Sequence, residues 1–295
     1  MSQKPVAATD PVNGLSFDVE EYFQVANFVE AIPRASWDEI PRRAADATRG
    51  ILDLLDRHEA RATFFTLGWL AEKEPDLVRE IVRRGHELAS HGWEHRLVYE
   101  LGPDGFRDEL RRSKAVLEDL SGQPVVGYRA SNFSITAETP WALEILLEEG
   151  SRYDSSIFPV KHPRYGIPGA QRFPHLLDVG GDSLVEIPLT TLRILGRNVP
   201  VAGGAYLRLF PLGLIRRGLA AANRAGQPGI VYLHPWEFDP EQPRVRTSVT
   251  RRLRHYTNLS KTAMKLGSLL AERRFVPLGE IAESVRSAGS PVRSI

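Results

Sequence analysis

Three histidines lie within the stretch "HELASHGWEH", at positions 86, 91 and 95. His91 and His95 are four residues apart, so they can converge on one metal ion from a helical turn or from a tight loop. His86 and His91 are five residues apart, which separates them by about 140° around a helix. Ser90 stands where the helical zinc-protease pattern H-E-x-x-H has its second histidine. We therefore expect His91 and His95 to share a metal and His86 to be structural, with two surface or hydrogen-bonded histidines as the alternative.

A third metal ligand is available in "LSFDVEEYFQV", residues 15–25, which places three carboxylates among apolar residues. Side chains alternate along a strand, so Asp18 and Glu20 should share one face while Glu21 points to the other. An oxygen ligand beside two histidines is typical of catalytic zinc and of two-histidine, one-carboxylate iron sites. One of Asp18 and Glu20 could bind the metal while the other remains free as a base. Capping of the next helix is the alternative role for such acids, and Glu21 has no assigned role.

The elements that position these residues alternate along the chain. Short β-rich runs are followed by longer segments of helical period, which predicts parallel strands joined by crossover helices. The expected strands lie at 14–19, 61–68, 86–91, 124–131, 153–158 and 228–239, and the expected helices at 44–60, 74–85, 102–122, 139–150, 213–226 and 258–275. Ionisable side chains stand at five of the strand ends, namely Asp18, His91, Arg129, Asp154 and His234. The carboxyl ends of parallel strands meet at one end of a barrel, so we expect a single pocket.

The chain has 295 residues, a length that permits one large domain or two average ones. We expect a single domain over 14–285, with tails at 1–13 and 286–295. The stretch from about 160 to 210 is rich in proline and glycine, and we interpret it as an insertion.

Composition excludes several classes of protein. The 38 basic and 37 acidic residues leave a net charge of +1, which gives no reason to expect nucleic acid as a partner. Cysteine is absent, so disulfides, thiolate zinc clusters and cysteine nucleophiles are excluded. No signal-peptide-like run and no apolar stretch of about 20 residues occurs, so we expect a cytoplasmic protein without a membrane span. The basic run "RRLRH" (251–255) is expected to be a solvated face rather than a track for an anionic polymer.

Seven stretches, taken in order, resemble the NodB-homology polysaccharide deacetylases, carbohydrate esterase family four, and most of all the subgroup encoded with exosortase and exopolysaccharide loci. The resemblance covers about residues 14 to 280. The matching stretches are "SFDVEEYFQV", "ATFFTLG", "HELASHGWEHRLVYEL", "RRSKAVLEDLSGQPVVGYRASNFSI", "YDSSIFP", "LHPWEFDPEQPR" and "RRLRHYTNL".

This resemblance implies an α/β fold, a distorted (β/α) barrel of about seven parallel strands. It also implies metal-dependent hydrolysis that releases acetate from N-acetylhexosamine units of a polysaccharide, here an exopolysaccharide or its precursor. The metal would be Zn²⁺ first, with Co²⁺, Ni²⁺ or Fe²⁺ as alternatives.

The resemblance assigns roles within the first motifs. Most of the family has two adjacent aspartates, the first a base and the second a ligand, whereas this chain has the form D-x-E. Asp18 is therefore the expected base, and Glu20 the expected ligand beside His91 and His95. Arg129 matches the arginine that holds the base.

Further roles follow from the later motifs. His234 would protonate the departing sugar nitrogen, because imidazole suits proton transfer near neutral pH, and Asp154 would hold that imidazole. The stretch "RASN" departs from the family's proline-containing version, and a backbone amide of Asn132 or Phe133 is expected to stabilise the oxyanion. Tyr22, Trp93, Tyr128 and Trp236 are expected as aromatic walls for the sugar, with packing in the core as the equally frequent alternative.

Three rival functions use the same residues. A glycoside hydrolase would employ Asp18 and Glu20 as its carboxylate pair and would need no metal. A catalytically silent carbohydrate-binding protein would keep the pocket without turnover. An iron oxygenase would use the two histidines and one carboxylate, but no other feature supports it.

Overall fold

The computed structural model describes residues 11–162 and 164–289. Its strands are β1 (Val12–Val19), β2 (Thr63–Thr66), β3 (Glu87–Ser90), β4 (Gly127–Tyr128), β5 (Tyr153–Asp154), β6 (His175–Val179), β7 (Asp182–Glu186), β8 (Thr191–Ile194), β9 (Arg197–Pro200), β10 (Ile230–Leu233) and β11 (Arg274–Val276). Its α-helices are α1 (Ala44–Arg57), α2 (Gly68–Lys73), α3 (Pro75–Arg83), α4 (Val98–Ser121), α5 (Trp141–Glu148), α6 (Ala205–Leu209), α7 (Leu212–Arg224), α8 (Val249–Tyr256), α9 (Thr262–Leu270) and α10 (Leu278–Ser287). Short 3-10 helices are η1 (Arg34–Glu39), η2 (Ser131–Phe133), η3 (Pro235–Phe238) and η4 (Leu259–Lys261).

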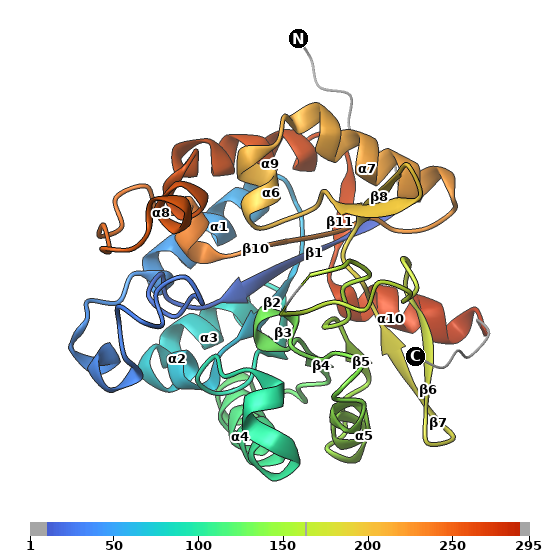
Figure 1. Cartoon of the computed structure of the whole chain (residues 1–295), viewed down its shortest axis with the longest axis horizontal. Coiled ribbons are helices and arrows are strands. Elements are labelled where there is room, and N and C mark those ends of the chain that lie inside the picture. Colours follow the sequence, from blue (N-terminus) through green and yellow to red (C-terminus); the bar gives the residue numbers. More distant parts are fainter. Residues whose placement is uncertain (1–10, 163, 290–295) are drawn as a thin grey trace.

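One curled sheet organises the molecule (Figure 1). The strands follow the order β10, β1, β2, β3, β4, β5, β7, β6, and every neighbouring pair is parallel except β6 with β7. The two sides of the sheet approach each other where the amide of Thr190, just beyond β7, donates to the carbonyl of Ile230 in β10 at 3.2 Å. The expected distorted barrel of parallel strands is confirmed.

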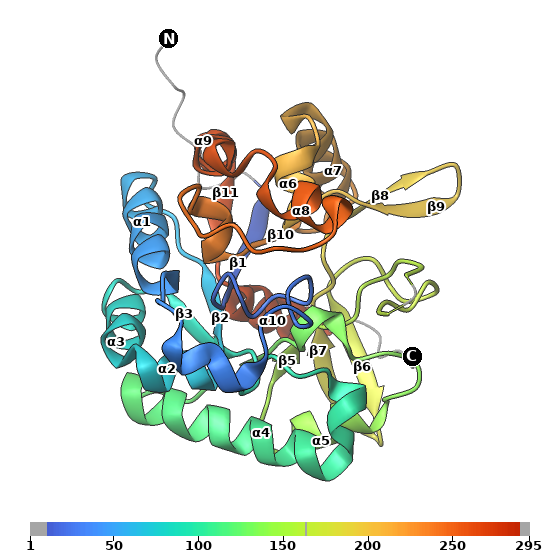
Figure 2. The same ribbon diagram turned by 60° about the vertical axis from the view of Figure 1, so that its left-hand side comes forward.

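The alternation of side chains in β1 and β2 separates two apolar cores. Phe17 and Phe64 point outward into the cluster that packs beneath α1 and α9, and Figure 2 shows α1, α3 and α4 along this outer side. Phe65 points inward, into a second cluster that fills the barrel. Asp18 lies on the same inward face of β1 as Ser16, since both contact Arg129, so the strand directs its carboxylate into the barrel.

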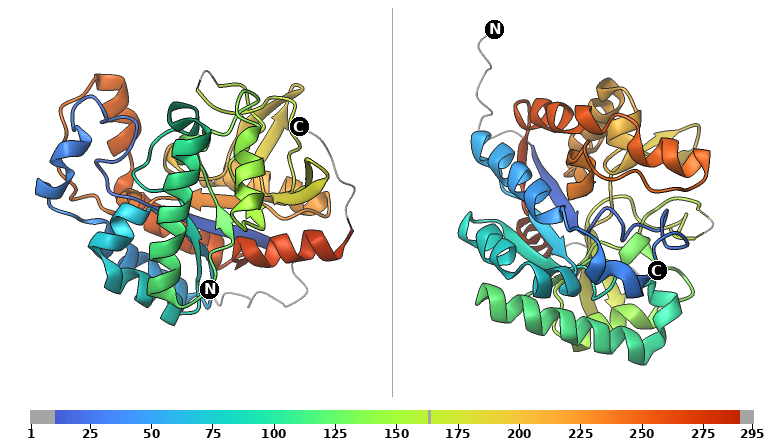
Figure 3. Two further views of the ribbon diagram at one scale, coloured as in Figure 1. Left: turned by 90° about the horizontal axis from the view of Figure 1, so that it is seen from below. Right: turned by 90° about the vertical axis from the view of Figure 1, so that its left-hand side faces the viewer.

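Helix α10 closes the barrel at the amino ends of the strands (Figure 3). Leu278 and Ile281 of this helix belong to the inner cluster. The helix is fixed by its first amides, since Leu278 donates to Oγ1 of Thr63 at 2.7 Å and Gly279 donates to Oε2 of Glu87 at 2.9 Å. Helix α10 therefore covers the amino ends of the strands, opposite their carboxyl ends.

The structure differs from the sequence interpretation in several elements. The stretch from 160 to 210 is not wholly an insertion, because β7 pairs with β5 in the main sheet, while β8 and β9 form a separate hairpin. The helices α2, α6, α8 and α10 and the strand β11 were also missed. The expected tails lie mainly outside the described residues, and their described parts, 11–13 and 286–289, belong largely to β1 and α10. None of the described helices is long and apolar enough to cross a membrane.

Candidate active site

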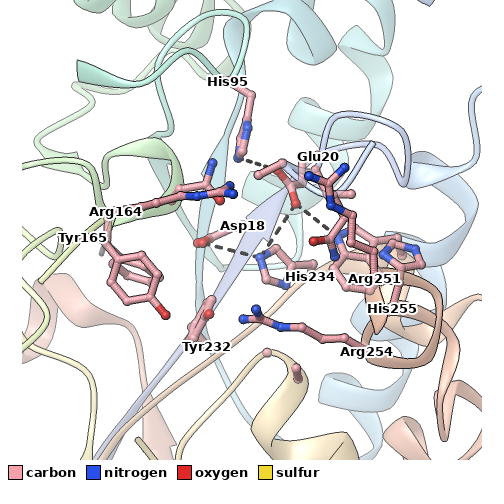
Figure 4. Close-up of a pocket in the computed structure, with 18 of the residues that line it drawn as sticks. Asp18, Glu20, His95, Arg164, Tyr165, Tyr232, His234, Arg251, Arg254 and His255 are labelled. Atoms are coloured by element: carbon pink, nitrogen blue, oxygen red, sulfur yellow. Dashed lines mark hydrogen bonds and ion pairs between the residues drawn. The ribbon is translucent and has the colours of Figure 1, made fainter. Parts of the chain in front are cut away.

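A pocket of about 380 Å³ lies at the carboxyl ends of the strands. Its wall is formed by loops that follow β1, β3, β4, β5 and β10, together with residues of α8 (Figure 4). Of the residues singled out in the sequence, those that line it are Asp18, Glu20, His91, His95, Asn132, Phe133, His234 and Trp236. The single pocket expected at the strand ends is thus present.

Glu20, His91 and His95 converge inside this pocket. One potential ligand atom from each lies within 4.8 Å of the others, and all three residues are buried. Both histidines lie in the loop after β3 rather than on a helix. Gly92 and His95 have positive φ values of 79° and 56°, and Gly68 donates its amide to the carbonyl of Gly92 at 2.9 Å. The tight turn therefore brings residues four apart onto one side.

The donor set fits a divalent cation. Nδ1 of His91 contacts the carbonyl of Arg129 at 2.7 Å, which fixes that nitrogen as the donor and leaves Nε2 for a metal. Burial lowers the pKa of His91 to about 4, so the ring is neutral, as a ligand must be. Oε2 of Glu20 is buried without a hydrogen bond, 2.8 Å from Nε2 of His95. A cation bound by both atoms, or a proton shared between them, would satisfy this close contact.

Glu20 itself is held as an anion. Its Oε1 accepts the indole N–H of Trp236 at 3.0 Å. Burial alone would raise the pKa of the carboxyl, but His95, His234 and His91 outweigh burial and lower the pKa to about 2. A carboxylate that is ionised near neutral pH, beside two imidazoles, matches the ligands of catalytic zinc.

Arg129 anchors Asp18 from inside the barrel. Its Nη1 donates to Oδ1 of Asp18 at 2.6 Å and to the hydroxyl of Ser16 at 2.9 Å, and its Nη2 donates to the hydroxyl of Ser155 at 2.8 Å. The guanidinium is fully buried and lies 4.1 Å from the ring of Phe65. The charge-assisted bond fixes one oxygen of Asp18 and leaves Oδ2 directed toward the pocket, 4.0 Å from Nε2 of His234.

His234 is oriented by Glu237. Its Nδ1 lies 2.8 Å from Oε1 of Glu237, so Nε2 faces Asp18 and Glu20, 3.7 Å from Oε1 of the latter. Burial would lower the pKa of His234, but the bond to Glu237 and the nearby carboxylates raise it to about 9. Arg208 in turn donates its Nε to Oε2 of Glu237 at 2.6 Å. The imidazole is thus poised as a proton donor.

The expectation that Asp154 holds His234 is wrong. Asp154 is buried and accepts the hydroxyl of Ser156 at 2.5 Å, and the same hydroxyl oxygen accepts the amide of Ala130 at 2.8 Å. Burial raises the pKa of Asp154 to about 6. Asp154 therefore supports the loop after Arg129. The partner of His234 could have been found in "HPWE", because a histidine, a proline and a glutamate three residues after the histidine form the start of η3 as a capping box.

Three of the four expected aromatic walls are core residues and do not line the pocket. Tyr22 packs edge-on against Phe23. The guanidinium of Arg112 lies over the ring of Trp93 at 3.4 Å, and Tyr128 packs edge-on against another buried ring. Only Trp236 remains, stacked on His234 with 5.1 Å between ring centroids. Pocket residues that the sequence did not indicate include Tyr99, Tyr165, Arg164, Arg208, Tyr232 and Arg254.

The expected oxyanion donor is narrowed to one amide. Asn132 and Phe133 both have left-handed backbones, with φ values of 53° and 55°. The amide of Phe133 donates to the carbonyl of Ala130 at 3.0 Å and is occupied. Two consecutive strained residues at the rim of a pocket are typical of a functional loop, and Asn132 is the remaining candidate.

Glu21 caps a helix. Its Oε1 accepts the amides of Arg43 and Ala44, at 3.0 and 3.1 Å, at the start of α1. Burial raises the pKa of Glu21 to about 7. Capping was the alternative considered for the acids at the end of this strand, and it describes Glu21. His86 lies outside the pocket, buried against Phe64.

A half-barrel of parallel strands with a buried two-histidine, one-carboxylate group at its open end defines the class of fold and site. Residues 35–146 match the family described as polysaccharide deacetylase, and residues 155–283 match a family described as a domain of unknown function, DUF3473. Over residues 35–146 the chain therefore has a polysaccharide deacetylase domain, and the family resemblance seen in the sequence is confirmed for that part.

Similar proteins include a peptidoglycan-N-acetylglucosamine deacetylase of Bacillus cereus, 36% identical over 75 residues, which are 25% of this chain and 27% of that protein. A chitooligosaccharide deacetylase of Bradyrhizobium is 25% identical over 126 residues, 42% of this chain and 55% of that protein. The matches thus span about a quarter to a half of these relatives.

Solved structures show the same fold. A crystal structure assigned to the polysaccharide deacetylases, from Mycobacterium smegmatis, superposes with a TM-score of 0.67 and 22% identity over 99% of this chain and 96% of the other. The Puue allantoinase superposes with a TM-score of 0.61 and 16% identity over 95% of this chain and 92% of that one. Structures named for different enzymes therefore share this fold, so the fold alone does not identify the reaction.

Proposed function

We propose that this protein is a metal-dependent N-deacetylase, which hydrolyses the acetamido group of N-acetylhexosamine units and releases acetate. The observation that supports it is that three sets of side chains meet in one pocket. The first is Asp18, which is bound by Arg129; the second is the group Glu20, His91 and His95; the third is His234. Amide hydrolysis needs a base for water, stabilisation of the carbonyl oxygen and an acid for the leaving nitrogen.

Each residue can perform one of these tasks. Glu20, His91 and His95 would hold the ion, which supplies Lewis acidity toward a water and toward the acetyl carbonyl. Oδ2 of Asp18 accepts a proton from the attacking water, while Arg129 keeps the carboxylate oriented. As the C–N bond breaks, Nε2 of His234 donates a proton to the sugar nitrogen, so that acetate and a free amine leave. The amide of Asn132 is the proposed oxyanion donor.

The finer parts of the proposal concern metal, substrate and location. We propose Zn²⁺ as the metal, with Co²⁺, Ni²⁺ and Fe²⁺ as alternatives. We propose an exopolysaccharide or its precursor as substrate, and membership of the subgroup that accompanies exopolysaccharide loci. The relatives named for peptidoglycan and chitooligosaccharide deacetylation support an N-acetylated saccharide. The cytoplasmic location is likewise proposed, and cell fractionation tests it.

The test measures acetate released from N-acetylated oligosaccharides by the zinc-loaded protein, with and without a chelator. We expect release that chelation abolishes and that Asp18→Asn reduces by at least a hundredfold. Reducing ends formed without acetate, and without need of metal, would favour a glycoside hydrolase. Affinity for glycans without turnover in any metal form would favour a silent binding protein.

A further inference from the structure

Three arginines surround the mouth of the pocket above the proposed catalytic residues. Arg251 and Arg254 come from α8, and Arg164 from the loop after β5. Figure 4 shows the three labelled arginine side chains around Asp18, Glu20 and His234. Residues 251 and 254 are three apart and share one face of α8. The run "RRLRH" is therefore not only a solvated face, because two of its arginines line the pocket.

The acidic groups near this mouth are already matched. Asp18 is bound by buried Arg129, and Glu20 belongs to the proposed metal ligands. Arg251 is paired with Glu30, whose Oε2 lies 2.8 Å from its Nη1.

The remaining arginines of the pocket differ in whether a carboxylate neutralises their charge. Arg208 is buried and is occupied by Glu237 and by main-chain carbonyls. Across residues 11–162 and 164–289, no ion pair joins Arg164 or Arg254 to a carboxylate. Both are exposed at the mouth. The outer part of the pocket therefore carries positive charge that the described chain does not neutralise.

Two aromatic rings, His162 and Tyr165, line the same side of the pocket as Arg164. Tyr165 and Arg254 both line the pocket, and the nearby charge of Arg254 opposes the rise that burial causes in the pKa of Tyr165. The ring of His162 stacks on Tyr165, with 3.8 Å between centroids and 17° between planes. Rigid rings beside a planar guanidinium give a surface that can take both a sugar ring and an anionic group, since guanidinium binds carboxylate and phosphate oxygens in pairs.

We propose that the saccharide bound in this pocket is anionic, carrying a carboxylate or a phosphate on or next to the N-acetylhexosamine, and that Arg164 and Arg254 bind this anion. The inference rests on the proposed function for the identity of the sugar. The overall charge of +1 gives no attraction at long range, so the selectivity comes from these two side chains.

The experiment measures binding of the full, zinc-loaded chain to two immobilised probes by surface plasmon resonance. One is a tetrasaccharide of alternating N-acetylglucosamine and glucuronic acid, and the other is neutral N-acetylchitotetraose. We expect tighter binding to the acidic probe, and an affinity that falls as ionic strength rises only for that probe. Arg164→Gln and Arg254→Gln should each weaken acidic binding by about fivefold, and together by more than tenfold, without weakening neutral binding.

Arg252→Gln is the matched control. Arg252 is an exposed neighbour on the same helix that does not line the pocket, so the variant changes net charge equally and should bind both probes as wild type does. Competition by N-acetylglucosamine 1-phosphate, compared with the disaccharide of glucuronic acid and N-acetylglucosamine, tells which anion the site prefers.

Equal affinity for the two probes, or equal effects of Arg252→Gln and Arg254→Gln, would overturn the proposal. Acetate release from the neutral probe is measured as well, so that failure of the anion preference can be told apart from failure of the deacetylase function. If release persists while the arginine variants bind as wild type does, the anionic preference falls and the deacetylase stands. If the protein prefers the acidic probe and no acetate forms from either probe, the anion site stands and the deacetylase function falls.

Discussion

Glu237 bridges His234 and a buried arginine. Nδ1 of His234 lies 2.8 Å from one oxygen of Glu237, and Arg208 donates to the other oxygen at 2.6 Å. Arg208 and Glu237 are almost completely shielded from solvent, so the glutamate is fixed on both sides. The imidazole therefore receives its orientation from the turn that follows its own strand, and not from a neighbouring strand.

This bridge predicts a split between kcat and KM. Glu237→Gln should lower kcat for acetate release about ten- to a hundredfold while KM changes little, because the amide no longer fixes the ring and its proton. The variant also leaves Arg208 buried without a counter-charge, which costs about 3 kcal/mol or more of unfolding free energy. The double variant Glu237→Gln/Arg208→Met should recover stability without recovering kcat. Recovery of both would mean that Glu237 acts only on stability.

Glu20 and Asp18 should separate metal binding from turnover. Glu20→Gln removes the charged ligand, so we expect the zinc content after dialysis to fall at least tenfold together with activity. Asp18→Asn should retain zinc and lose turnover, because Asp18 is bound to Arg129 and is not one of the three grouped ligands. Metal analysis of the two proteins beside their acetate release distinguishes the roles. Equal zinc loss in both variants would contradict this division.

Glu21 is the internal control for that pair. It is adjacent to Glu20 but caps α1 through the amides of Arg43 and Ala44. Glu21→Gln should therefore keep zinc and activity, and lose about 1 kcal/mol of unfolding free energy, the usual magnitude for a lost helix cap. Thermal unfolding together with metal analysis measures both effects, and loss of zinc would place Glu21 in the metal site.

The sequence predicted the ligand group because each of its signals is local. The spacing of His91 and His95 and the alternation of Asp18 and Glu20 both lie within a few residues. The elements that were missed depend on tertiary contacts. Helix α10 is fixed by Thr63 and Glu87, more than 190 residues away along the chain.

The roles of some residues were predicted wrongly for a related reason. Tyr22, Trp93 and Tyr128 have the same residue type whether they line a pocket or fill a core, and only packing decides. Asp154 follows a strand, as catalytic residues of barrels do, yet its side chain turns to Ser156. The sequence can place a residue at the end of a strand, but it does not identify the residue to which its side chain will bond.

The closure of the barrel predicts a contrast between two glycines. A Cβ on Gly14 in β1 would lie 2.5 Å from Cδ2 of Leu278 and 2.8 Å from Cδ1 of Ile281. Gly14→Ala should therefore destabilise the protein by about 1 to 3 kcal/mol, because it pushes α10 from the barrel. Gly50→Ala in α1, where no atom lies within 4 Å of the new Cβ, should stabilise it by up to about 1 kcal/mol. Urea unfolding measures both free energies. Equal effects of the two substitutions would contradict the packing of α10 against the amino ends of the strands.

His86 predicts the acid sensitivity of the fold. Neither ring nitrogen has a hydrogen-bond partner among the described residues, and burial lowers the pKa of His86 from 6.5 to about 4. The folded state thus holds a neutral ring. Above pH 6.5 both states are neutral at this site and its contribution to stability is complete. As the pH falls toward 4, only the unfolded chain takes up the proton, so stability is lost, by about 3 kcal/mol across this window.

Replacing the ring should remove that dependence. His86→Leu keeps an apolar side chain against Phe64 and has no group to titrate, so its unfolding free energy should fall less than that of the wild type between pH 7 and pH 4.5. Urea titrations at the two pH values give the difference, expected at about 2 to 3 kcal/mol. If both proteins lose the same free energy, the acid sensitivity arises elsewhere and His86 is not the residue that limits the fold at low pH.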